Sequence, residues 1–158
     1  MRKRVIKPAV TEAAAAEPEW LDVEKLARVE VTSEEATRPI ESALIPGEEG
    51  GWRAAQPGPQ TIRLVFDQPQ RLSRVWLLFI EPDRARTQEF VLRWSPDGGR
   101  SFRDIVRQQW NFGPPETIRE AEDYRVQLSG VTALELVIVP DTSGGEARAS
   151  VTQWRLAG

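Results

Sequence analysis

The sequence of 158 residues contains neither cysteine nor histidine. Without cysteine the chain has no disulfide bridge, no thiolate nucleophile and no sulfur ligand for a metal ion. Without histidine, Ser-His-Asp and Cys-His catalysis are excluded, and so is nearly all zinc chemistry. These two absences argue against an enzyme, and they predict a protein without a bound metal or other cofactor.

Long apolar runs are missing as well, and the net charge is small. No window approaches the roughly 18 apolar residues of a membrane span, and Lys7, Pro8 and Thr11 interrupt the apolar stretch of a secretion signal. We therefore expect a cytoplasmic protein that does not bind membranes. The formal net charge of −3 creates no field that would attract nucleic acid, so nucleic acid is not an expected partner.

Alternation of apolar and polar residues is the main pattern that the chain does contain. Runs of this kind, separated by Gly, Pro and Asp turns, cover residues 26–32, 61–67, 72–81, 87–95, 102–110, 122–128, 132–140 and 148–156. They predict an all-β fold, an antiparallel β-sandwich of about eight strands with a jelly-roll arrangement, in one domain over residues 25–158. Residues 1–24 lack sustained periodicity and are expected to form a flexible N-terminal tail.

The turns between these runs sort the loops onto the two ends of the sandwich, because each short turn of an antiparallel meander reverses the chain. Four long polar loops fall at one end, which we call the top end: residues 46–59, 82–86, 111–121 and 141–147. Binding residues on a rigid scaffold are concentrated in such loops. A ligand is therefore expected at the top end.

The same reasoning places a group of candidate ligand-binding residues at the top end. The group combines guanidinium forks, amides and an aromatic ring, namely Arg84, Arg86, Gln88, Arg107, Gln109 and Trp110. Guanidinium and amide groups hydrogen-bond sugar hydroxyls or carboxylates, and an aromatic ring stacks on a sugar. The residues suit an internal polar network that pins the long loops equally well, and the sequence leaves both interpretations open.

Glu120 and Glu122 are the carboxylate pair that remains for acid–base chemistry. Two positions apart on a strand, they face the same side and lie close enough for their charges to interact. A solvated strand edge is the interpretation we favour for them. Asp141 and Glu146, on a top-end loop, are oxygen donors of the kind that calcium prefers, although solubility alone accounts for acidic residues in a loop.

Five segments carry a resemblance to a known family: GWRAA from residue 51, QTIRLVFDQPQRLSRVWL from residue 60, EFVLRWSPDGGRSF from residue 89, ALELVIVP from residue 133 and VTQWRL from residue 151. On these residues the chain resembles the coagulation factor 5/8 type C, or discoidin, family of galactose-binding-like jelly rolls over roughly residues 26–156. The step from Ser95 to Gly98 resembles the family's Ser-x-Asp-Gly hairpin. The resemblance implies a non-catalytic module that binds sugars, lipid headgroups or proteins through loops at one end, with both termini at the other.

Departures from the family pattern bear on the ligand. Gln153 stands where sugar-binding relatives often carry an acidic calcium ligand, and residues 82–86 are charged where membrane-binding relatives expose apolar side chains. We therefore expect a non-catalytic module that binds carbohydrate or a small anionic ligand through the top-end loops. The alternative is a cytosolic protein–protein interaction module, favoured by the lack of cysteine and of a secretion signal.

Overall fold

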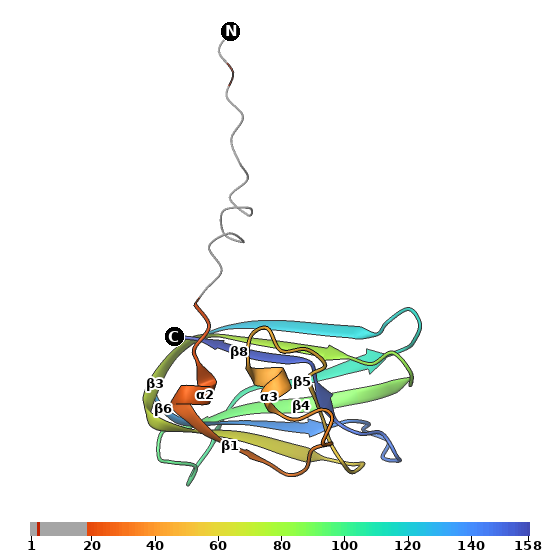
Figure 1. Cartoon of the computed structure of the whole chain (residues 1–158), viewed down its shortest axis with the longest axis horizontal. Helices are drawn as coiled ribbons and strands as arrows, with labels where there is room; N and C mark the ends of the chain where they lie inside the picture. The colour runs from red at the N-terminus through yellow and green to blue at the C-terminus, as the bar shows by residue number, and fades with distance from the viewer. Residues whose placement is uncertain (1–2, 4–18) are drawn as a thin grey trace.

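Strands dominate the part of the chain that the structure describes, which is residue 3 and residues 19–158 of a computed structural model (Figure 1). The eight strands are β1 (Ala27–Val31), β2 (Trp52–Arg53), β3 (Gln60–Ile80), β4 (Arg86–Ser95), β5 (Arg103–Phe112), β6 (Arg119–Val139), β7 (Ser150–Val151) and β8 (Gln153–Ala157). Two single-turn helices, α2 (Val23–Leu26) and α3 (Glu41–Leu44), accompany them. All paired strands run antiparallel, which confirms the predicted all-β sandwich. No helix among these residues has the length and apolar character to cross a membrane.

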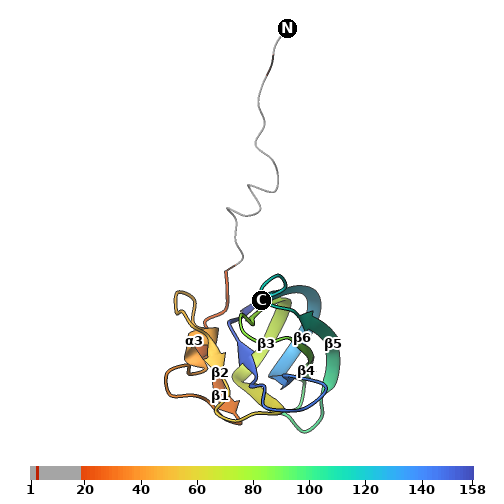
Figure 2. The ribbon, with the colours of Figure 1, turned by 90° about the vertical axis from the view of Figure 1, so that its right-hand side faces the viewer.

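The two longest strands, β3 and β6, bend at their midpoints and contribute to both layers of the sandwich. One layer has the order β1–β3–β6–β4–β5. The other layer has the order β8–β3–β6, in which β8 pairs with the last half of β3 and that half pairs with the first half of β6. The end-on view in Figure 2 shows the sheet curling around the core. The sequence predicted turns at residues 68–71 and 129–131. Instead, pairing continues through both bends in shifted register, with Gln70 opposite Val131, because β-bulges absorb the change of direction.

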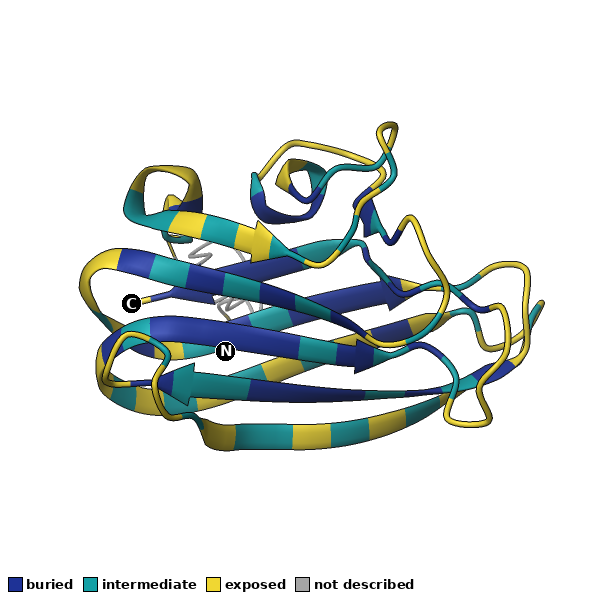
Figure 3. Ribbon diagram, turned by 90° about the horizontal axis from the view of Figure 1, so that it is seen from below, coloured by how far each residue is buried: buried dark blue, intermediate teal, exposed yellow. Residues whose placement is uncertain are grey.

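Buried residues form a core between the layers. Along the strands they alternate with more exposed residues, as the sequence predicted (Figure 3). Phe90 of β4 stacks on Phe79 of β3 with 5.2 Å between ring centroids, and this contact joins the two layers. Trp76 of β3 is only half-buried, because the neighbouring residues Val75 and Leu77 take the inward positions and turn the indole outward. Its Nε1 donates to Oε1 of Gln153 on the adjacent strand at 3.0 Å.

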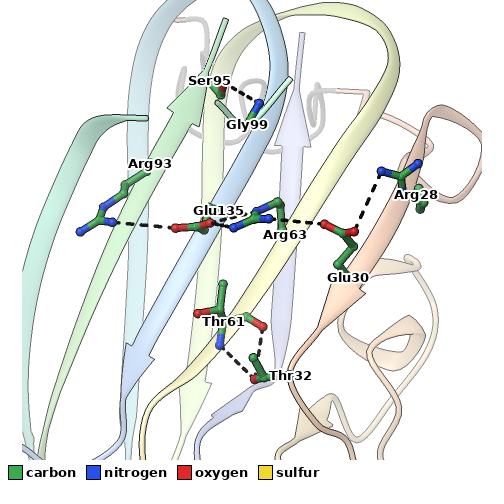
Figure 4. A network of polar contacts seen from close by, with 9 residues as sticks. All are labelled: Arg28, Glu30, Thr32, Thr61, Arg63, Arg93, Ser95, Gly99 and Glu135. Atoms are coloured by element: carbon green, nitrogen blue, oxygen red, sulfur yellow. Dashed lines mark hydrogen bonds and ion pairs between the residues drawn. The ribbon is translucent and has the colours of Figure 1, made fainter. Parts of the chain in front are cut away.

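A row of alternating charges crosses the outward face of the first layer (Figure 4). Glu135 of β6 is buried and accepts hydrogen bonds from Nε and Nη2 of Arg63 on β3, at 3.0 and 2.6 Å. Arg63 also approaches Glu30 of β1 at 3.6 Å, and Arg93 of β4 approaches Glu135 at 3.9 Å. The row ties four neighbouring strands together, so these arginines are engaged in holding the sheet.

The long loops gather at the top end, as the order of turns predicted (Figure 1). There β4 begins with Arg86 opposite Phe112, the last residue of β5. The first residue of β6, Arg119, likewise lies opposite Ile80, the last residue of β3. The connections between these strands therefore meet on one side of the molecule.

The termini of the domain meet at the opposite end, and the predicted tail of residues 1–24 is wrong at its C-terminal boundary. Trp20 forms a β-bridge with Ala157, and the guanidinium of Arg74 lies over its indole ring at 5.1 Å from the ring centroid. Val23 is buried in the core. The ordered domain thus includes the segment from Trp20 onward, and nearly all of the preceding residues lie outside the described chain.

Candidate ligand-binding site

The six residues predicted to bind a ligand do not form one group in the structure. Arg86 and Gln88 begin β4 with their side chains directed into the sandwich, and they are 5% and 0% exposed. Arg86 donates from Nε to Oε1 of Glu81 and from Nη1 to the carbonyl oxygen of Pro140, both at 2.7 Å. Its guanidinium also lies 4.8 Å from the centroid of the Phe112 ring. These contacts place Arg86 and Gln88 in an internal polar network.

Arg107, Gln109 and Trp110 lie on β5, an edge strand of the first layer. Arg107 and Gln109 share the outward face of this strand, and Trp110 lies on the opposite, inward face. Arg107 donates from Nη1 to Oε1 of Glu89 at 2.8 Å, and this hydrogen bond raises the pKa of Arg107. Gln109 and Trp110 line a small separate hollow together with Asn111. None of these residues lines the larger cleft at the top end.

Arg84 does line that cleft, which has a volume of about 480 Å³ and which we call the top-end cleft. Its walls come from the connection between β1 and α3, from the segment around β2, from the loop between β3 and β4 and from the segment around β7. Charged side chains of both signs line the space, namely Arg38, Arg53, Arg84, Arg148, Glu81, Asp83 and Glu146. Four segments of the chain thus combine into one polar site.

The four arginines of the top-end cleft differ in what holds them. Arg148 and Arg53 approach the same carboxylate oxygen of Glu35, at 2.8 and 3.6 Å, so one acid neutralises part of their charge. Arg38 donates from Nε to a backbone carbonyl of the loop before β2, at 3.1 Å. Arg84 is exposed and has no hydrogen bond or ion pair from its guanidinium to any residue that the structure describes. Its planar fork of donors is free for a ligand.

Hydrogen-bond acceptors stand among these donors. Asp83 and Glu146 are exposed at the cleft and form no ion pair within the described chain. Ser150 and Thr152 add hydroxyl groups, which both donate and accept. A surface of interleaved donors and acceptors suits a polyhydroxylated ligand better than a ligand that offers a single kind of polar group.

Glu81, a carboxylate in the wall of the cleft, is not poised to deliver a proton. Burial raises the pKa of Glu81, but hydrogen bonds from Arg86 and from the backbone of Asp83 outweigh it, so the pKa lies below its ordinary value. Glu120 does have a raised pKa, of about 7, yet it is fully buried inside the sandwich. A general acid must hold its proton within reach of the reacting group. Neither Glu81 nor Glu120 meets this requirement at the cleft.

Close approach of β2 to β7 builds one wall of the cleft, and Gly51 permits it. Gly51 has a φ of +67°, and a Cβ at this position would lie 2.6 Å from Cα of Thr152. The next residue, Trp52, is fully buried opposite Val151. Glycine and tryptophan of the GWRAA segment thus fix the backbone that carries Arg53 into the cleft.

Sequence reasoning found the loops of the cleft but missed three of its arginines, Arg38, Arg53 and Arg148. Arg53 was within reach of the argument, because it lies in a loop already assigned to the top end. The interpretation of Glu120 as part of a solvated strand edge is wrong. It shares the inward face of β6 with Tyr124, and this alternation was the available signal.

No protein-family model matches the chain, and no curated protein matches its sequence. Solved structures do match the chain. CBM32-3, a family 32 carbohydrate-binding module from a family 31 glycoside hydrolase of Clostridium perfringens, aligns with a TM-score of 0.65 at 19% identity, covering 97% of this chain and 99% of that chain. The fold is that of the galactose-binding-like β-sandwiches.

Two further structures of this fold contain a bound sugar. The module CpGH89CBM32-5 of Clostridium perfringens, in complex with GalNAc-β-1,3-galactose, aligns with a TM-score of 0.64 at 17% identity, over 89% of this chain and 100% of that chain. The family 32 module of AlyQ, in complex with 4,5-unsaturated mannuronic acid, aligns with a TM-score of 0.61 at 13% identity, over 83% and 94%. Similarity at this level of identity establishes the shared galactose-binding-like fold.

Proposed function

We propose that the protein is a non-catalytic module that binds carbohydrate in the top-end cleft. The observation that carries this proposal is the free guanidinium of Arg84 beside the unpaired carboxylates of Asp83 and Glu146 in an open cleft of about 480 Å³. Sugar hydroxyls donate and accept hydrogen bonds, so a sugar satisfies both kinds of group at once. The volume lies within the range of small-molecule sites.

Two of the similar structures support the choice of ligand class, because one holds an amino-sugar disaccharide and the other a uronic acid. The two kinds of sugar make different demands on the cleft. A neutral sugar needs the mixed donors and acceptors, whereas a uronic acid would add a charge-assisted hydrogen bond to the fork of Arg84. Contact with a carboxylate would also weaken as salt concentration rises, because exposed charges are screened.

Binding of the purified protein to a panel of neutral and uronic-acid oligosaccharides tests the proposal. We expect at least one glycan to bind, and calorimetry should show that Arg84→Ala lowers its affinity by roughly tenfold or more, as for loss of a charge-assisted hydrogen bond. Arg107→Ala is the matched control, because Arg107 is also an exposed arginine but lies on β5 and is paired with Glu89. This variant should keep the affinity of the unmodified protein.

Two results would contradict the proposal in different ways. Loss of affinity in Arg107→Ala with full affinity in Arg84→Ala would move the binding site from the top-end cleft to β5. Failure of every glycan to bind, together with capture of a specific protein partner, would favour the interaction module instead.

A further inference from the structure

A buried chain of hydrogen bonds leads from the core of the sandwich to the loop between β3 and β4. Glu120 of β6 is fully buried, and its Oε1 accepts a hydrogen bond from the side-chain amide of Gln88 at 3.1 Å. The amide oxygen of Gln88 accepts from Nη1 of Arg86 at 3.2 Å. Arg86 in turn holds Glu81, whose Oε2 accepts from the backbone N–H of Asp83 at 3.1 Å. Asp83 belongs to the wall of the top-end cleft.

A second, shorter connection runs through the backbone. The N–H of Glu81 donates to the carbonyl oxygen of Ile118 at 2.7 Å, and Ile118 precedes Glu120 by two residues. The start of β6 and the loop that carries Arg84 are therefore joined both through side chains and directly. A change at Glu120 has two routes to the cleft.

The surroundings of Glu120 leave one of its two carboxyl oxygens without a hydrogen bond. Its Oε2 is buried without a hydrogen-bond partner among the described residues, and so is Nε1 of Trp110, which lies opposite Gln88 on the neighbouring strand. The charged and titratable groups near Glu120 are Arg86 on β4, Glu122 and Tyr124 on β6 and, beyond Arg86, Glu81 at the end of β3.

Charge balance in this buried cluster depends on the proton of Glu120. Arg86 already forms an ion pair with Glu81 at 2.7 Å, so a protonated Glu120 leaves the pair neutral. An ionised Glu120 adds a second carboxylate that competes for the same guanidinium, with one oxygen unsatisfied in the core. This unfavourable burial of charge is relieved if Arg86 moves toward Glu120 or if the start of β6 loosens. Either change frees the Glu81 side chain, which then no longer fixes the backbone of Asp83.

We propose that Glu120 is a buried proton-binding residue that positions the loop between β3 and β4, so that glycan binding in the top-end cleft weakens when Glu120 loses its proton. The inference rests on the proposed function of the cleft for its effect on affinity. The loop change itself is independent of any ligand. Gln88 and Arg86 act as positioning residues in this arrangement and do not touch the sugar.

The raised pKa of Glu120 brings the loss of its proton close to neutral pH. Burial, followed by the charge of Glu122, raises the pKa of Glu120 to about 7, while Gln88 and Arg86 act in the opposite direction. The ordinary value is 4.5, so between these two pH values the folded protein holds a proton that the unfolded chain has released. Stability therefore decreases as pH rises through this window, and above it Glu120 is ionised in both states.

Ligand-free measurements test the proton linkage. Carbon-13 titration of the carboxyl groups in the unmodified protein should show Glu120 ionising near pH 7. The urea midpoint should fall between pH 5 and pH 8, and the amide of Asp83 should exchange faster at pH 8 than at pH 6 after correction for the intrinsic rate. Glu120→Gln should abolish both pH effects. Glu135→Gln, a buried carboxylate in the charge row of the same strand, should retain them.

Affinity for a glycan identified in the panel gives the second readout. We expect the unmodified protein to bind at least about fivefold more weakly at pH 8 than at pH 6, a coupling of ordinary size, and Glu120→Gln to bind equally at both. A Glu120 carboxyl that titrates below pH 5.5, an Asp83 amide without pH-dependent protection, or a pH-independent affinity would each overturn the proposal. If no glycan binds at either pH, the proposed function fails, and the amide exchange still decides the proton linkage.

Discussion

Arginine side chains of this protein differ in role according to their position on a strand or loop. Arg84 and Arg86 are two residues apart, yet Arg84 is exposed at the top-end cleft and Arg86 is buried in the sandwich. Arg86 is the first residue of β4, where alternation turns it inward, whereas Arg84 belongs to the loop before that strand. Arg63 and Arg107 lie on outward faces and pair with carboxylates of neighbouring strands. Residue type therefore predicted the capacity to bind an anion or a hydroxyl, but not which arginine remains free to do so.

Replacement of Arg86 by alanine is expected to lower the free energy of unfolding by about 2–4 kcal/mol. The change leaves the Glu81 carboxylate and the Pro140 carbonyl without the donor that satisfies them in a largely buried environment. Arg84→Ala removes no side-chain hydrogen bond or ion pair between described residues and should alter stability by no more than about 0.5 kcal/mol. Urea unfolding of both variants makes the comparison, and a loss below about 1 kcal/mol for Arg86→Ala would contradict a structural role.

Glu120 marks the limit of sequence reasoning for a single residue. The spacing correctly placed it on the same face of a strand as Glu122, since strand side chains alternate. Whether that face points to solvent or to the core depends on which strand covers it, and the covering residue, Gln88, lies 32 positions earlier in the chain. Pairing and packing over such separations depend on global register, which a local pattern does not contain.

Among the secondary-structure elements, the positions of the longer strands were predictable, whereas the short strand β2, within the expected loop of residues 46–59, and the bends of β3 and β6 were not. Pro69 and Gly130 mark the two bends, and both residues are typical of turns because proline lacks a ladder donor and glycine adopts positive φ. The two bends lie beside each other, so pairing continues through bulges where the sequence indicated chain reversals. Local chemistry marks a change of direction, but only the partner strand determines whether the ladder is broken.

The approach of β2 to β7 can be tested with adjacent glycines. Gly50→Ala should cost about 1 kcal/mol, because its φ of +90° disfavours a side chain although nothing lies within 4 Å of the new Cβ. Gly51→Ala should cost a further 1–3 kcal/mol or so, because its Cβ meets the backbone of β7. It should also weaken glycan binding by displacing Arg53. Equal urea midpoints for the two variants would show that close packing against β7 is unimportant.

For the molecule as a whole, the order of turns predicted the separation of the top-end cleft from the chain termini. Each reversal of an antiparallel chain assigns the next loop to the opposite end, so the two ends follow from counting turns. The boundary of the domain did not follow in the same way. Trp20 contributes a single bridge to Ala157 and one contact with Arg74, and neither leaves a periodic pattern in the sequence. A segment held by isolated contacts resembles a tail until its packing partner is known.

Two truncations distinguish the predicted boundary at residue 24 from the observed one. Removal of residues 1–18 leaves in place the contacts that Trp20 and Val23 make with residues 19–158, and the melting temperature should change little. Removal of residues 1–24 exposes the core beside Val23, for about 1.5–3 kcal/mol, and removes the stacking of Arg74 on Trp20, for about 0.5–1 kcal/mol. Thermal unfolding followed by circular dichroism should therefore show a decrease of about 5–15 °C in melting temperature for the longer truncation.

Affinity for glycans should stay the same in both truncated proteins at a temperature where both are folded, because the cleft lies at the opposite end. Equal melting temperatures for the full chain and the longer truncation would restore the boundary at residue 24, and a decrease above about 5 °C for the shorter one would show that residues 1–18 also stabilise the domain.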